Sequence, residues 1–513
     1  MTTLQDVFRQ SVQKYPNKEA LVDMRLNKRW TFQEWDKEAN QLAQAFKEAG
    51  VQKGDRVSTV LYNTSEFVMT FVACIKLGAI FNPINFRLTE KEIEFILADA
   101  SPKIVVFEKT VRSEVQPLIE RFPQTQFWYI DEPLPNGVVS YYQKLQSTSS
   151  EVVKEILTEN DDYAIMYTSG TTGKPKGVVH SHRDMVDQST IMIGAQQLTS
   201  QDRGLSAAPL FHCAEMHCVF IPRLHIGATS IIVHHFDPEV VMKTIQSERV
   251  NSCFLAPTMW SMLVEEKNKM KMELPSLEKG LYGGAPMAPA LVKQVYETLN
   301  IKLFQAYGMT EMGPAITVLF DDEQLEKAGS AGKPLINHEI RVIQPDATDP
   351  EQVVPVGEQG EVIVRGPSMM SSYYRRPEAT KEVLRDGWYF TGDVGYTDED
   401  GYLWVNDRIK DMIVSGGENI YSREVEDTLF DHPEVLDVAV IGEPDEKWGE
   451  RVVAFVVLKN SSVTEEELDD FCKKSNRLAN YKRPRRYEFV NELPRNASGK
   501  LQKFKLREQM KSI

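Results

Sequence analysis

Apolar and polar residues alternate along the first third of the chain, first with the period of a helix and then with that of a strand. Between residues 31 and 50 the apolar side chains from Trp35 to Phe46 fall on one helical face, and Gly50 ends the pattern. A strand-like run at 56–61 follows directly. The alternation continues with helical patterns at 66–79 and 91–100 and short apolar runs at 103–107 and 163–167. Because such alternation is typical of strands joined by helical crossovers, we predict an α/β fold with largely parallel sheets.

The pattern changes twice in the second half of the chain. Short β-like segments separated by Gly, Pro and Asp turns between 355 and 407 predict a small antiparallel β subdomain. After Arg408, two helical and three strand-like patterns predict a compact α+β unit of about 100 residues. We therefore expect a large N-terminal domain at 1–407, a hinge at 408–411 and a small C-terminal domain at 412–513.

Composition and charge narrow the class of protein. The 513 residues are 42% apolar and 26% charged, as in ordinary globular domains, and a net charge of −15 argues against a general binder of nucleic acid. The segment 473–513 is an exception, because it holds 13 Lys and Arg residues against 3 Asp and Glu residues. The five cysteines form no Cys-x-x-Cys pair, and we find neither a signal-peptide pattern nor an apolar run long enough to span a membrane. We therefore expect a soluble protein of the reducing cytoplasm.

A loop rich in glycine and hydroxyl residues follows the strand-like run at 163–167. Glycines let backbone N–H groups approach an anion, hydroxyls donate further hydrogen bonds, and lysines supply positive charge. The spacing differs from the Walker A pattern, so we predict a phosphate loop of another kind, with a polar surface turn as the alternative. The residues expected to contact phosphate are Thr168, Ser169, Gly170, Thr171, Thr172, Gly173 and Lys176.

Six further motifs follow this loop in order. They are Gly283-Gly284-Ala285-Pro286, Gln305-Ala306-Tyr307-Gly308-Met309-Thr310-Glu311, Tyr389-Phe390-Thr391-Gly392-Asp393, Asp407-Arg408-Ile409-Lys410-Asp411, Ser415-Gly416-Gly417-Glu418-Asn419-Ile420 and Pro494-Arg495-Asn496-Ala497-Ser498-Gly499-Lys500. Together they resemble the signature of the adenylate-forming superfamily of acyl-CoA synthetases, peptide-synthetase adenylation domains and beetle luciferases. The resemblance covers essentially the whole chain and is closest to bacterial medium- and long-chain fatty acyl-CoA synthetases. It implies a mobile C-terminal domain that rotates about Lys410, with an ordinary surface lysine as the alternative for this residue.

The resemblance also implies ATP-dependent activation of a carboxylic acid. A carboxylate is a poor electrophile, so its oxygen must first be bonded to the α-phosphorus of ATP, giving acyl-AMP and pyrophosphate, before CoA replaces AMP. The resemblance assigns Lys500 to bridge the carboxylate and the α-phosphate. Glu311 would hold Mg²⁺, a hard cation that takes oxygen ligands. A solvated surface lysine and a helix-capping glutamate are the structural alternatives for these two residues.

Other motif residues are expected to bind the nucleotide and CoA. Asp393 can accept hydrogen bonds from both ribose hydroxyls, and Arg408 can donate to the same sugar. Tyr307 offers a ring face to adenine, with ordinary core packing as the alternative. The remaining nucleotide-binding candidates are Gly283, Gly284, Ala285, Gln305, Ala306, Gly308 and Thr310. The candidates for lining the path of the CoA thiol, unless they form a plain glycine turn, are Gly416, Gly417 and Glu418.

The acid substrate is the least determined part of the prediction. His212, which we expect to take part in the chemistry, stands where amino-acid-activating relatives carry an Asp, so a substrate without an α-amino group is implied. The expected acyl pocket is lined by three mostly apolar segments, at about 207–222, 253–262 and 281–287, and it suits a medium or long fatty acid. Its candidate lining residues, with ordinary core packing as the alternative for the apolar ones, are His212, Met216, Phe220, Trp260, Met262 and Met287. Aryl-acid CoA ligases share almost every motif, so an aromatic acid is the main alternative.

Two further functions and two kinds of partner stay open. An enzyme that loads a carrier protein is disfavoured because no carrier domain fits after Lys500. A non-catalytic nucleotide-binding regulator is disfavoured because Lys500 and Glu311 are both retained. The basic segment 473–513 suits the phosphates of ATP and CoA, and weak contact with anionic lipid stays open, as does a homodimer. We expect no nucleic-acid partner.

Overall fold

Contacts within the chain divide it into two compact units, which we describe one at a time. The computed structural model describes residues 2–168, 175–285, 287–345, 347–416, 418–459, 463–475, 478–495 and 501–511. The first unit comprises residues 1–339 and 365–384, and the second comprises residues 340–364 and 385–513. The predicted hinge at 408–411 lies inside the second unit, so this division does not test the predicted domain boundary.

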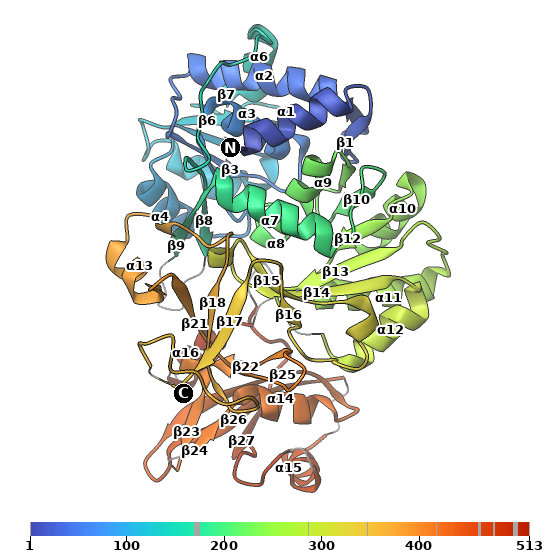
Figure 1. The fold of residues 1–513 in the computed structure, drawn as a ribbon, viewed down its shortest axis with the longest axis vertical. Coiled ribbons are helices and arrows are strands. Elements are labelled where there is room, and N and C mark those ends of the chain that lie inside the picture. The colour runs from blue at the N-terminus through green and yellow to red at the C-terminus, as the bar shows by residue number, and fades with distance from the viewer. Residues whose placement is uncertain are drawn as a thin grey trace. The chain divides into compact units, whose positions relative to one another are not determined.

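Two sheets frame the first unit (Figure 1). The larger sheet has the order β16-β15-β14-β13-β12-β10-β11-β1-β2, and its inner pairs from β14 to β1 are parallel. Its strands are β1 (Glu19–Asp23), β2 (Lys28–Thr31), β10 (Arg203–Ser206), β11 (Thr229–Ile232), β12 (Ser252–Phe254), β13 (Lys279–Gly283), β14 (Lys302–Gly308), β15 (Ala315–Leu319) and β16 (Lys333–Pro334).

The second sheet has the order β19-β9-β8-β4-β3-β5-β6-β7, and its neighbouring strands are parallel from β8 to β7. Its strands are β3 (Arg56–Val60), β4 (Ile80–Pro83), β5 (Ile104–Phe107), β6 (Gln126–Tyr129), β7 (Val139–Ser140), β8 (Asp162–Thr168), β9 (Lys176–Ser181) and β19 (Ser372–Tyr373).

Helices connect and cover these strands, and their ends follow capping signals in the sequence. The Thr31 side chain accepts from the backbone of Glu34 to start one helix, and Ser181 and Asp184 form a capping box at the start of another. The helices of this unit are α1 (Leu4–Lys14), α2 (Phe32–Glu48), α3 (Ser65–Leu77), α4 (Glu90–Ala100), α5 (Arg112–Val115), α6 (Tyr141–Ser147), α7 (His182–Ala195), α8 (Cys213–Glu215), α9 (Ile221–Ile226), α10 (Pro238–Glu248), α11 (Pro257–Met270), α12 (Pro289–Leu299) and α13 (Pro377–Val383). Short helical turns are η1 (Lys109–Val111), η2 (Gln116–Leu118), the π-helical η3 (Met216–Phe220), η4 (Thr310–Met312) and η5 (Asp321–Glu323).

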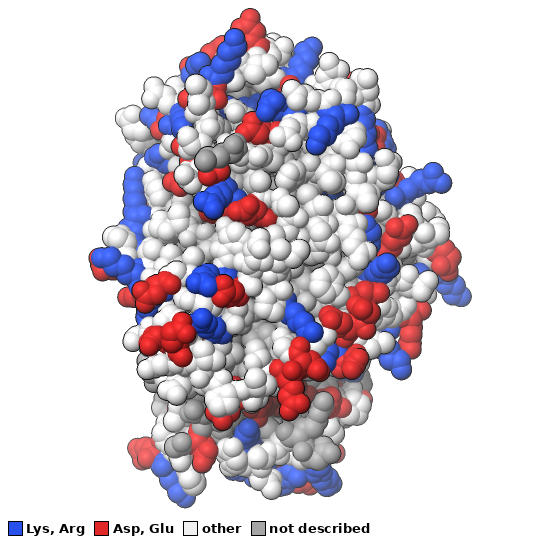
Figure 2. All heavy atoms as spheres, in the orientation of Figure 1, with Lys and Arg blue, Asp and Glu red and all other residues white. Residues whose placement is uncertain are grey.

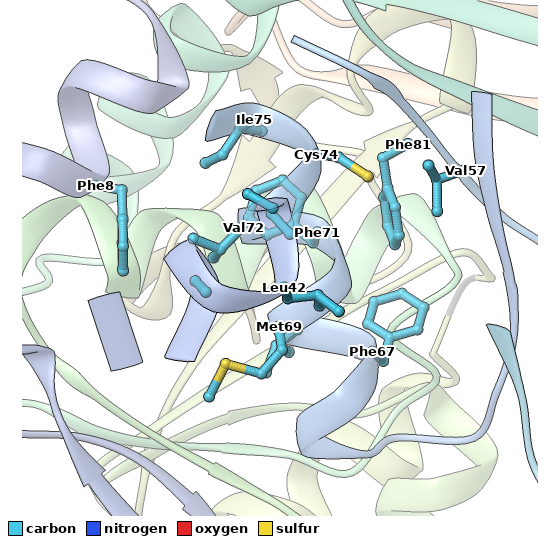
Figure 3. Close-up of a cluster of buried hydrophobic side chains, with 14 of the residues drawn as sticks. Phe8, Leu42, Val57, Phe67, Met69, Phe71, Val72, Cys74, Ile75 and Phe81 are labelled. Atoms are coloured by element: carbon cyan, nitrogen blue, oxygen red, sulfur yellow. The ribbon is translucent and has the colours of Figure 1, made fainter. Parts of the chain in front are cut away.

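The main core of the first unit surrounds α3, in which every residue is buried (Figure 3). Phe67 and Phe71 place their ring centroids 5.2 and 5.7 Å from that of Phe81 on β4. Phe8 and Leu42 belong to the same cluster from α1 and α2. An apolar helix covered on all sides in this way fixes the positions of the strands that flank it.

The second unit contains two smaller sheets (Figure 1). In the first, antiparallel pairing joins β18 to β21 and β21 to β22, as the turn-rich sequence predicts. Its strands are β17 (Glu339–Ile343), β18 (Gly360–Arg365), β20 (Leu384–Arg385), β21 (Trp388–Thr397) and β22 (Leu403–Arg408). The elements of the C-terminal α+β part are η6 (Ile409–Asp411), β23 (Ile413–Ser415), β24 (Glu418–Ile420), α14 (Ser422–Phe430), β25 (Val435–Asp445), β26 (Gly449–Leu458), α15 (Glu465–Lys474), β27 (Arg486–Phe489) and α16 (Lys503–Lys511).

The predicted fold class is therefore confirmed: largely parallel α/β sheets, a small antiparallel sheet and a C-terminal α+β part. Motion of that part stays a prediction. All five cysteines are buried free thiols. Within the described ranges, no helix combines the length and the apolar character that crossing a bilayer requires.

Candidate active site

The two strands that flank the predicted phosphate loop form an antiparallel hairpin. Thr168, the last residue of β8, lies opposite Lys176, the first residue of β9. The hairpin therefore closes the loop at its base and holds both residues at one end of the sheet. The predicted loop residues that lie outside the described residues are Ser169, Gly170, Thr171, Thr172 and Gly173.

Two motifs predicted to bind the nucleoside lie on neighbouring strands. The ends of β13 and β14 run parallel, with Gly283 opposite Ala306. A Cβ atom on Gly283 would lie 2.5 Å from the Ala306 carbonyl oxygen, and one on Gly308 would lie 1.7 Å from the Pro314 carbonyl oxygen. Glycine is thus required at both positions, because any other residue would push the strands apart. Gly284 follows with a φ of +78° and turns the chain away from the strand end, at the edge where α/β sheets bind ligands.

The other residues of these motifs have different surroundings. The side chain of Gln305 is buried, and its Oε1 lies 2.9 Å from the Tyr282 hydroxyl oxygen. Its amide therefore contributes to the core. Tyr307 and Ala306 are half-buried. Ala285 is also only partly covered, so the strand ends leave a partly accessible edge.

Glu311 lies on η4, directly after β14, and is tied to the phosphate-loop hairpin through Tyr373. The Tyr373 hydroxyl donates to Glu311 Oε1 across 2.7 Å, and Lys176 Nζ lies 4.6 Å from the centroid of the Tyr373 ring. Tyr373 reaches this position because β19 pairs with β9, with Tyr373 opposite Val178. The structure thus brings together the predicted metal ligand and a predicted phosphate ligand around a tyrosine that the sequence did not single out.

His212 and Thr310 also lie close to this group. His212 caps α8, and its Nδ1 accepts a hydrogen bond from the Ala214 backbone N–H across 3.2 Å. Since Nδ1 is the acceptor, the proton of the neutral ring lies on Nε2. The sulfur of Cys213 is 3.2 Å from Thr310 Oγ1, which places His212 beside the Glu311 turn.

The structure does not bring the apolar candidates for the acyl pocket together. Met216 and Phe220 lie in the core around α3, where the Phe220 ring centroid is 6.2 Å from that of Trp35. Trp260 and Met287 lie in a second cluster that packs under β12 and β13. These four are core residues, with at most 2% of their surface exposed, whereas the fifth apolar candidate, Met262, is 46% exposed.

A third apolar cluster joins the three segments that the sequence assigned to the pocket. Its partly buried members are Ala214, Met259 and Ala306, and they pack on buried side chains that come from these segments, from β14 and from other parts of the first unit. This group includes Ala208, Cys218, Val219, Phe254, Leu281 and Phe304. Because Ala306 follows Gln305 at the end of β14, this cluster lies directly beside the predicted nucleoside site.

In the second unit, Asp393 and Arg408 form an ion pair. They face each other across β21 and β22, and Arg408 Nε is 2.8 Å from Asp393 Oδ1. Asp393 is 4% exposed, and its backbone N–H donates to Thr391 Oγ1 across 2.9 Å. The two predicted ribose ligands are therefore held together on adjacent strands. The Asp393 carboxylate can accept hydrogen bonds from ribose hydroxyls and the Arg408 guanidinium can donate to them, so the pair is suited to bind one sugar.

Gly416, a predicted CoA contact, packs against an exposed tryptophan. Gly416 has a φ of +63°, its N–H donates to the Trp448 carbonyl oxygen across 2.8 Å, and its α-carbon faces the Trp448 ring. Trp448 is 50% exposed. Glu418 begins the strand that follows. Gly417 and Lys500 lie outside the described residues.

The predicted hinge is connected to the last helix of the chain. Lys410 is exposed on η6, and the neighbouring Asp411 pairs with Arg507 of α16 across 2.8 Å. Lys503, at the start of α16, pairs with Glu426 across 2.8 Å. The helix α16 is thus held by ion pairs to Asp411, next to Lys410, and to Glu426 of α14.

Much of the positive charge at the C-terminal end is balanced within the second unit. Ion pairs join Lys482 to Glu424, Arg483 to Asp469, Arg486 to Glu443, Arg495 to Asp437, Lys503 to Glu426 and Arg507 to Asp411. On the face shown in Figure 2, basic and acidic side chains lie among one another. The segment therefore offers less unopposed charge to an anionic surface than its composition suggests.

Comparison with known proteins agrees with the motifs. Residues 8–374 match the AMP-binding enzyme family, and residues 424–500 match the AMP-binding enzyme C-terminal domain. The chain is 35% identical over 510 residues to a long-chain-fatty-acid–CoA ligase of Mycobacterium tuberculosis, covering 98% of this chain and 97% of that protein. It is 38% identical over 482 residues to the feruloyl-CoA synthase of an Amycolatopsis species, covering 93% of each.

Solved structures give the same result for the fold. The o-succinylbenzoate–CoA synthetase of Bacillus subtilis, in complex with its acyl-adenylate intermediate, matches with a TM-score of 0.87 and 33% identity, covering 100% of this chain and 99% of that one. The order of the motifs, the pairing of their strands and these matches lead to one conclusion. The chain belongs to the AMP-binding enzyme family, within the adenylate-forming superfamily that includes the acyl-CoA synthetases.

Proposed function

We propose that the protein is an AMP-forming acid–CoA ligase that acts on fatty acids of medium to long chain. The observation that carries the proposal is the arrangement of Lys176, Tyr373 and Glu311, which places a cation and a carboxylate around one tyrosine at the base of the phosphate loop. A site for a triphosphate and its divalent cation needs both kinds of group. The relatives named above, which are themselves CoA ligases or synthetases, support the reaction class.

In the first half-reaction, an oxygen of the acid attacks the α-phosphorus of ATP. The bond between the α-phosphorus and the bridging oxygen breaks, and pyrophosphate leaves. Thr168 and Lys176 bind phosphate oxygens, and Lys500 stabilises the negative charge that develops between the carboxylate and the α-phosphate. The nucleoside is held by Asp393 and Arg408 at the ribose. The groups that receive adenine are Gly283, Gly284, Ala285, Ala306, Tyr307 and Gly308.

The surroundings of Glu311 suit a magnesium ion. Glu311 Oε1 accepts from Tyr373, and the described part of the chain offers Oε2 no hydrogen-bond donor. Among the described residues no three His, Cys, Asp or Glu side chains converge as metal ligands, so phosphate and water oxygens would complete the coordination shell. When bound, the ion would neutralise charge on the phosphates of ATP.

In the second half-reaction, the CoA thiolate attacks the acyl carbon, and AMP leaves with the oxygen that the acid supplied. Gly416, Gly417 and Glu418 line the path of the thiol, and Trp448 beside Gly416 offers a ring face to it. Rotation about 408–411, with a domain at 1–407 and a lid at 412–513, would exchange Lys500 for this segment. Two half-reactions with different catalytic groups require such an exchange.

The acid is proposed to lie against the cluster that contains Ala214, Met259 and Ala306. This surface is apolar, and His212 beside it is a neutral ring where an amino-acid substrate would require a carboxylate. An aliphatic chain gains about 0.8 kcal/mol for each buried CH₂ group. Since all five cysteines are buried free thiols, we also propose a reducing, cytoplasmic setting.

Pyrophosphate release with a panel of acids tests the proposal. Octanoate and palmitate should exceed benzoate, ferulate and phenylalanine in kcat/KM, by about 100-fold where three or four more CH₂ groups are buried. Met259→Trp should shift the preference from palmitate towards octanoate. Met262→Trp, on the same helix but at a side chain that is 46% exposed, should leave it unchanged. Preference for ferulate or benzoate would assign the aryl-acid alternative instead.

A further inference from the structure

The turn that carries Glu311 is held at both ends by buried histidines. His180 Nε2 lies 2.7 Å from the carbonyl oxygen of Thr310, and His217 Nδ1 lies 3.1 Å from that of Gly313. A carbonyl oxygen only accepts hydrogen bonds, so each of these nitrogens carries a proton. His180 is 0% exposed and His217 is 1% exposed, which leaves both hydrogen bonds shielded from water.

The two carbonyl groups between these ends are also occupied from outside the turn. The backbone N–H of Met370 donates to the Glu311 carbonyl oxygen across 2.7 Å. The Ser368 hydroxyl donates to the Met312 carbonyl oxygen across 2.6 Å. All four consecutive carbonyl groups of the turn therefore have a donor that fixes them, and we name these donors the clasp. The clasp consists of His180, His217, Ser368 and the backbone N–H of Met370.

The two histidines link the turn to the hairpin that carries the phosphate loop. His180 lies on β9, and His217 Nε2 accepts from the hydroxyl of Tyr163, which lies on β8. His180 and Ala164 are opposite one another in this hairpin. The hairpin that carries the phosphate loop and the backbone of the Glu311 turn are therefore joined through two imidazole rings, which meet the hairpin at His180 and Tyr163, near the end of the two strands that lies away from the loop.

His180 is a costly residue for a merely structural position. Among the described residues its Nδ1 has no hydrogen-bond partner, and the nearest carboxylate oxygen, Asp184 Oδ2, is 3.7 Å away. A buried polar atom without a partner destabilises the folded state, and an apolar side chain would fill the same space without that cost. The one hydrogen bond that the ring does make is the bond to Thr310, which indicates that this contact is the reason for the histidine.

We propose that His180 and His217 are positioning residues that hold the Glu311 turn in register with the phosphate loop and thereby set the affinity for the metal–nucleotide complex. The inference rests on the proposed function of Glu311 as a metal ligand. Groups that orient a metal ligand commonly change metal affinity by about 10- to 100-fold when they are removed. The histidines would act through the backbone of the turn and not through contact with the substrate.

Binding of Mn²⁺ to the protein with α,β-methylene-ATP, followed by electron paramagnetic resonance of free Mn²⁺, tests the inference without turnover. His180→Leu and His217→Leu remove the donors and should weaken Mn²⁺ binding by about 10- to 100-fold. His180→Gln returns a donor at the position of Nε2, and His217→Asn returns one at the position of Nδ1. Both variants should bind Mn²⁺ with an affinity within roughly threefold of that of the parent protein, because the donor that orients the turn is restored.

The matched control is His182→Asn. His182 is also buried, 1% exposed, and accepts from the Leu4 backbone N–H, so its loss removes a buried imidazole without touching the turn. Mn²⁺ affinity should not change in this variant. If the leucine variants do not fold, Ser368→Ala removes one donor of the clasp with little change of volume and should weaken Mn²⁺ binding in the same direction.

Two results would overturn the inference in distinguishable ways. If Glu311→Gln weakens Mn²⁺ binding but the leucine variants and Ser368→Ala do not, Glu311 is the ligand and the clasp has no positioning role. If Glu311→Gln itself binds Mn²⁺ as well as the parent protein, the proposed function of Glu311 fails and the clasp fails with it.

Discussion

The substitution Tyr373→Phe removes one hydroxyl group and keeps the ring that lies beside Lys176. The hydroxyl donates to Glu311 Oε1 across 2.7 Å, and Tyr373 is 4% exposed, so water cannot easily replace the lost donor. Without it, the carboxylate loses the contact that orients it towards the phosphate loop. We expect this loss of orientation to weaken mainly the binding of the triphosphate together with its metal ion.

The expected magnitude follows from the type of hydrogen bond. A hydrogen bond to a charged group contributes about 1.5–3 kcal/mol, and about 1.4 kcal/mol corresponds to a factor of ten. Tyr373→Phe should therefore lower kcat/KM for MgATP by roughly 10- to 100-fold. Tyr373→Leu also removes the ring near Lys176 and should cost a further factor of roughly two to five.

Pyrophosphate release at limiting ATP measures this effect. Tyr374→Phe is the matched control, because it removes a hydroxyl from the adjacent tyrosine, whose ring packs against the Arg375 guanidinium. It should change kcat/KM by less than about twofold, within the range of neutral surface substitutions. An equal loss in the two variants, or a loss below threefold in Tyr373→Phe, would refute the role of Tyr373 in orienting Glu311.

Three further substitutions have defined outcomes. Gly308→Ala should lower both the melting temperature and the affinity for ATP, because the added Cβ atom would lie 1.7 Å from the Pro314 carbonyl oxygen. Unchanged melting and ATP-binding curves would contradict this expectation. Burial lowers the pKa of His182 from 6.5 to about 4, so the unfolded chain binds this proton first as the pH falls. Between pH 7 and 5 the free energy of unfolding of the parent protein should fall by about 2 kcal/mol because of this group, whereas His182→Asn should lack this contribution. Urea titrations at the two pH values measure the difference. An equal fall in both proteins would show that protonation of His182 does not contribute to the pH dependence of stability. Lys410→Pro fixes φ near about −65° and should leave acyl-AMP formation intact while slowing thioester formation at least about tenfold in single-turnover assays. Equal loss of both steps would exclude Lys410 as the hinge.

Hydrophobic periodicity predicted most of the architecture, because each helix or strand shows its buried face in its own sequence. The apolar face at 31–50 corresponds to α2 (Phe32–Glu48), and the capping residues Ser181 and Asp184 mark the start of α7. The glycines of the motifs were also informative. Gly283 and Gly308 lie where backbones approach too closely for a side chain, a requirement that the residue type itself reveals.

The contacts that organise the Glu311 turn could not be predicted from local patterns. Tyr373 lies on a two-residue strand and pairs with Val178, far away in the sequence. His180 and His217 had no feature in the sequence that distinguished them from other buried histidines. Their roles depend on which carbonyl group each ring meets, and only the tertiary fold determines that.

The residues that line the acyl pocket could not be predicted for a different reason. Met216, Phe220 and Trp260 are apolar and lie in the predicted segments, yet they pack in cores, whereas Met259 lies on a partly buried cluster from the same segments. Apolar composition is the same for a core and for a pocket wall, so residue type alone cannot separate them.

The most direct test of the account is the fate of an acid oxygen. Octanoate labelled with ¹⁸O in both carboxylate oxygens should transfer one ¹⁸O atom to AMP during turnover with ATP and CoA, because the oxygen that attacks the α-phosphorus leaves with AMP. Mass spectrometry should find that label in AMP and pyrophosphate as the other product. Formation of ADP and ¹⁸O-labelled phosphate, or of AMP without label, would contradict activation through an acyl adenylate.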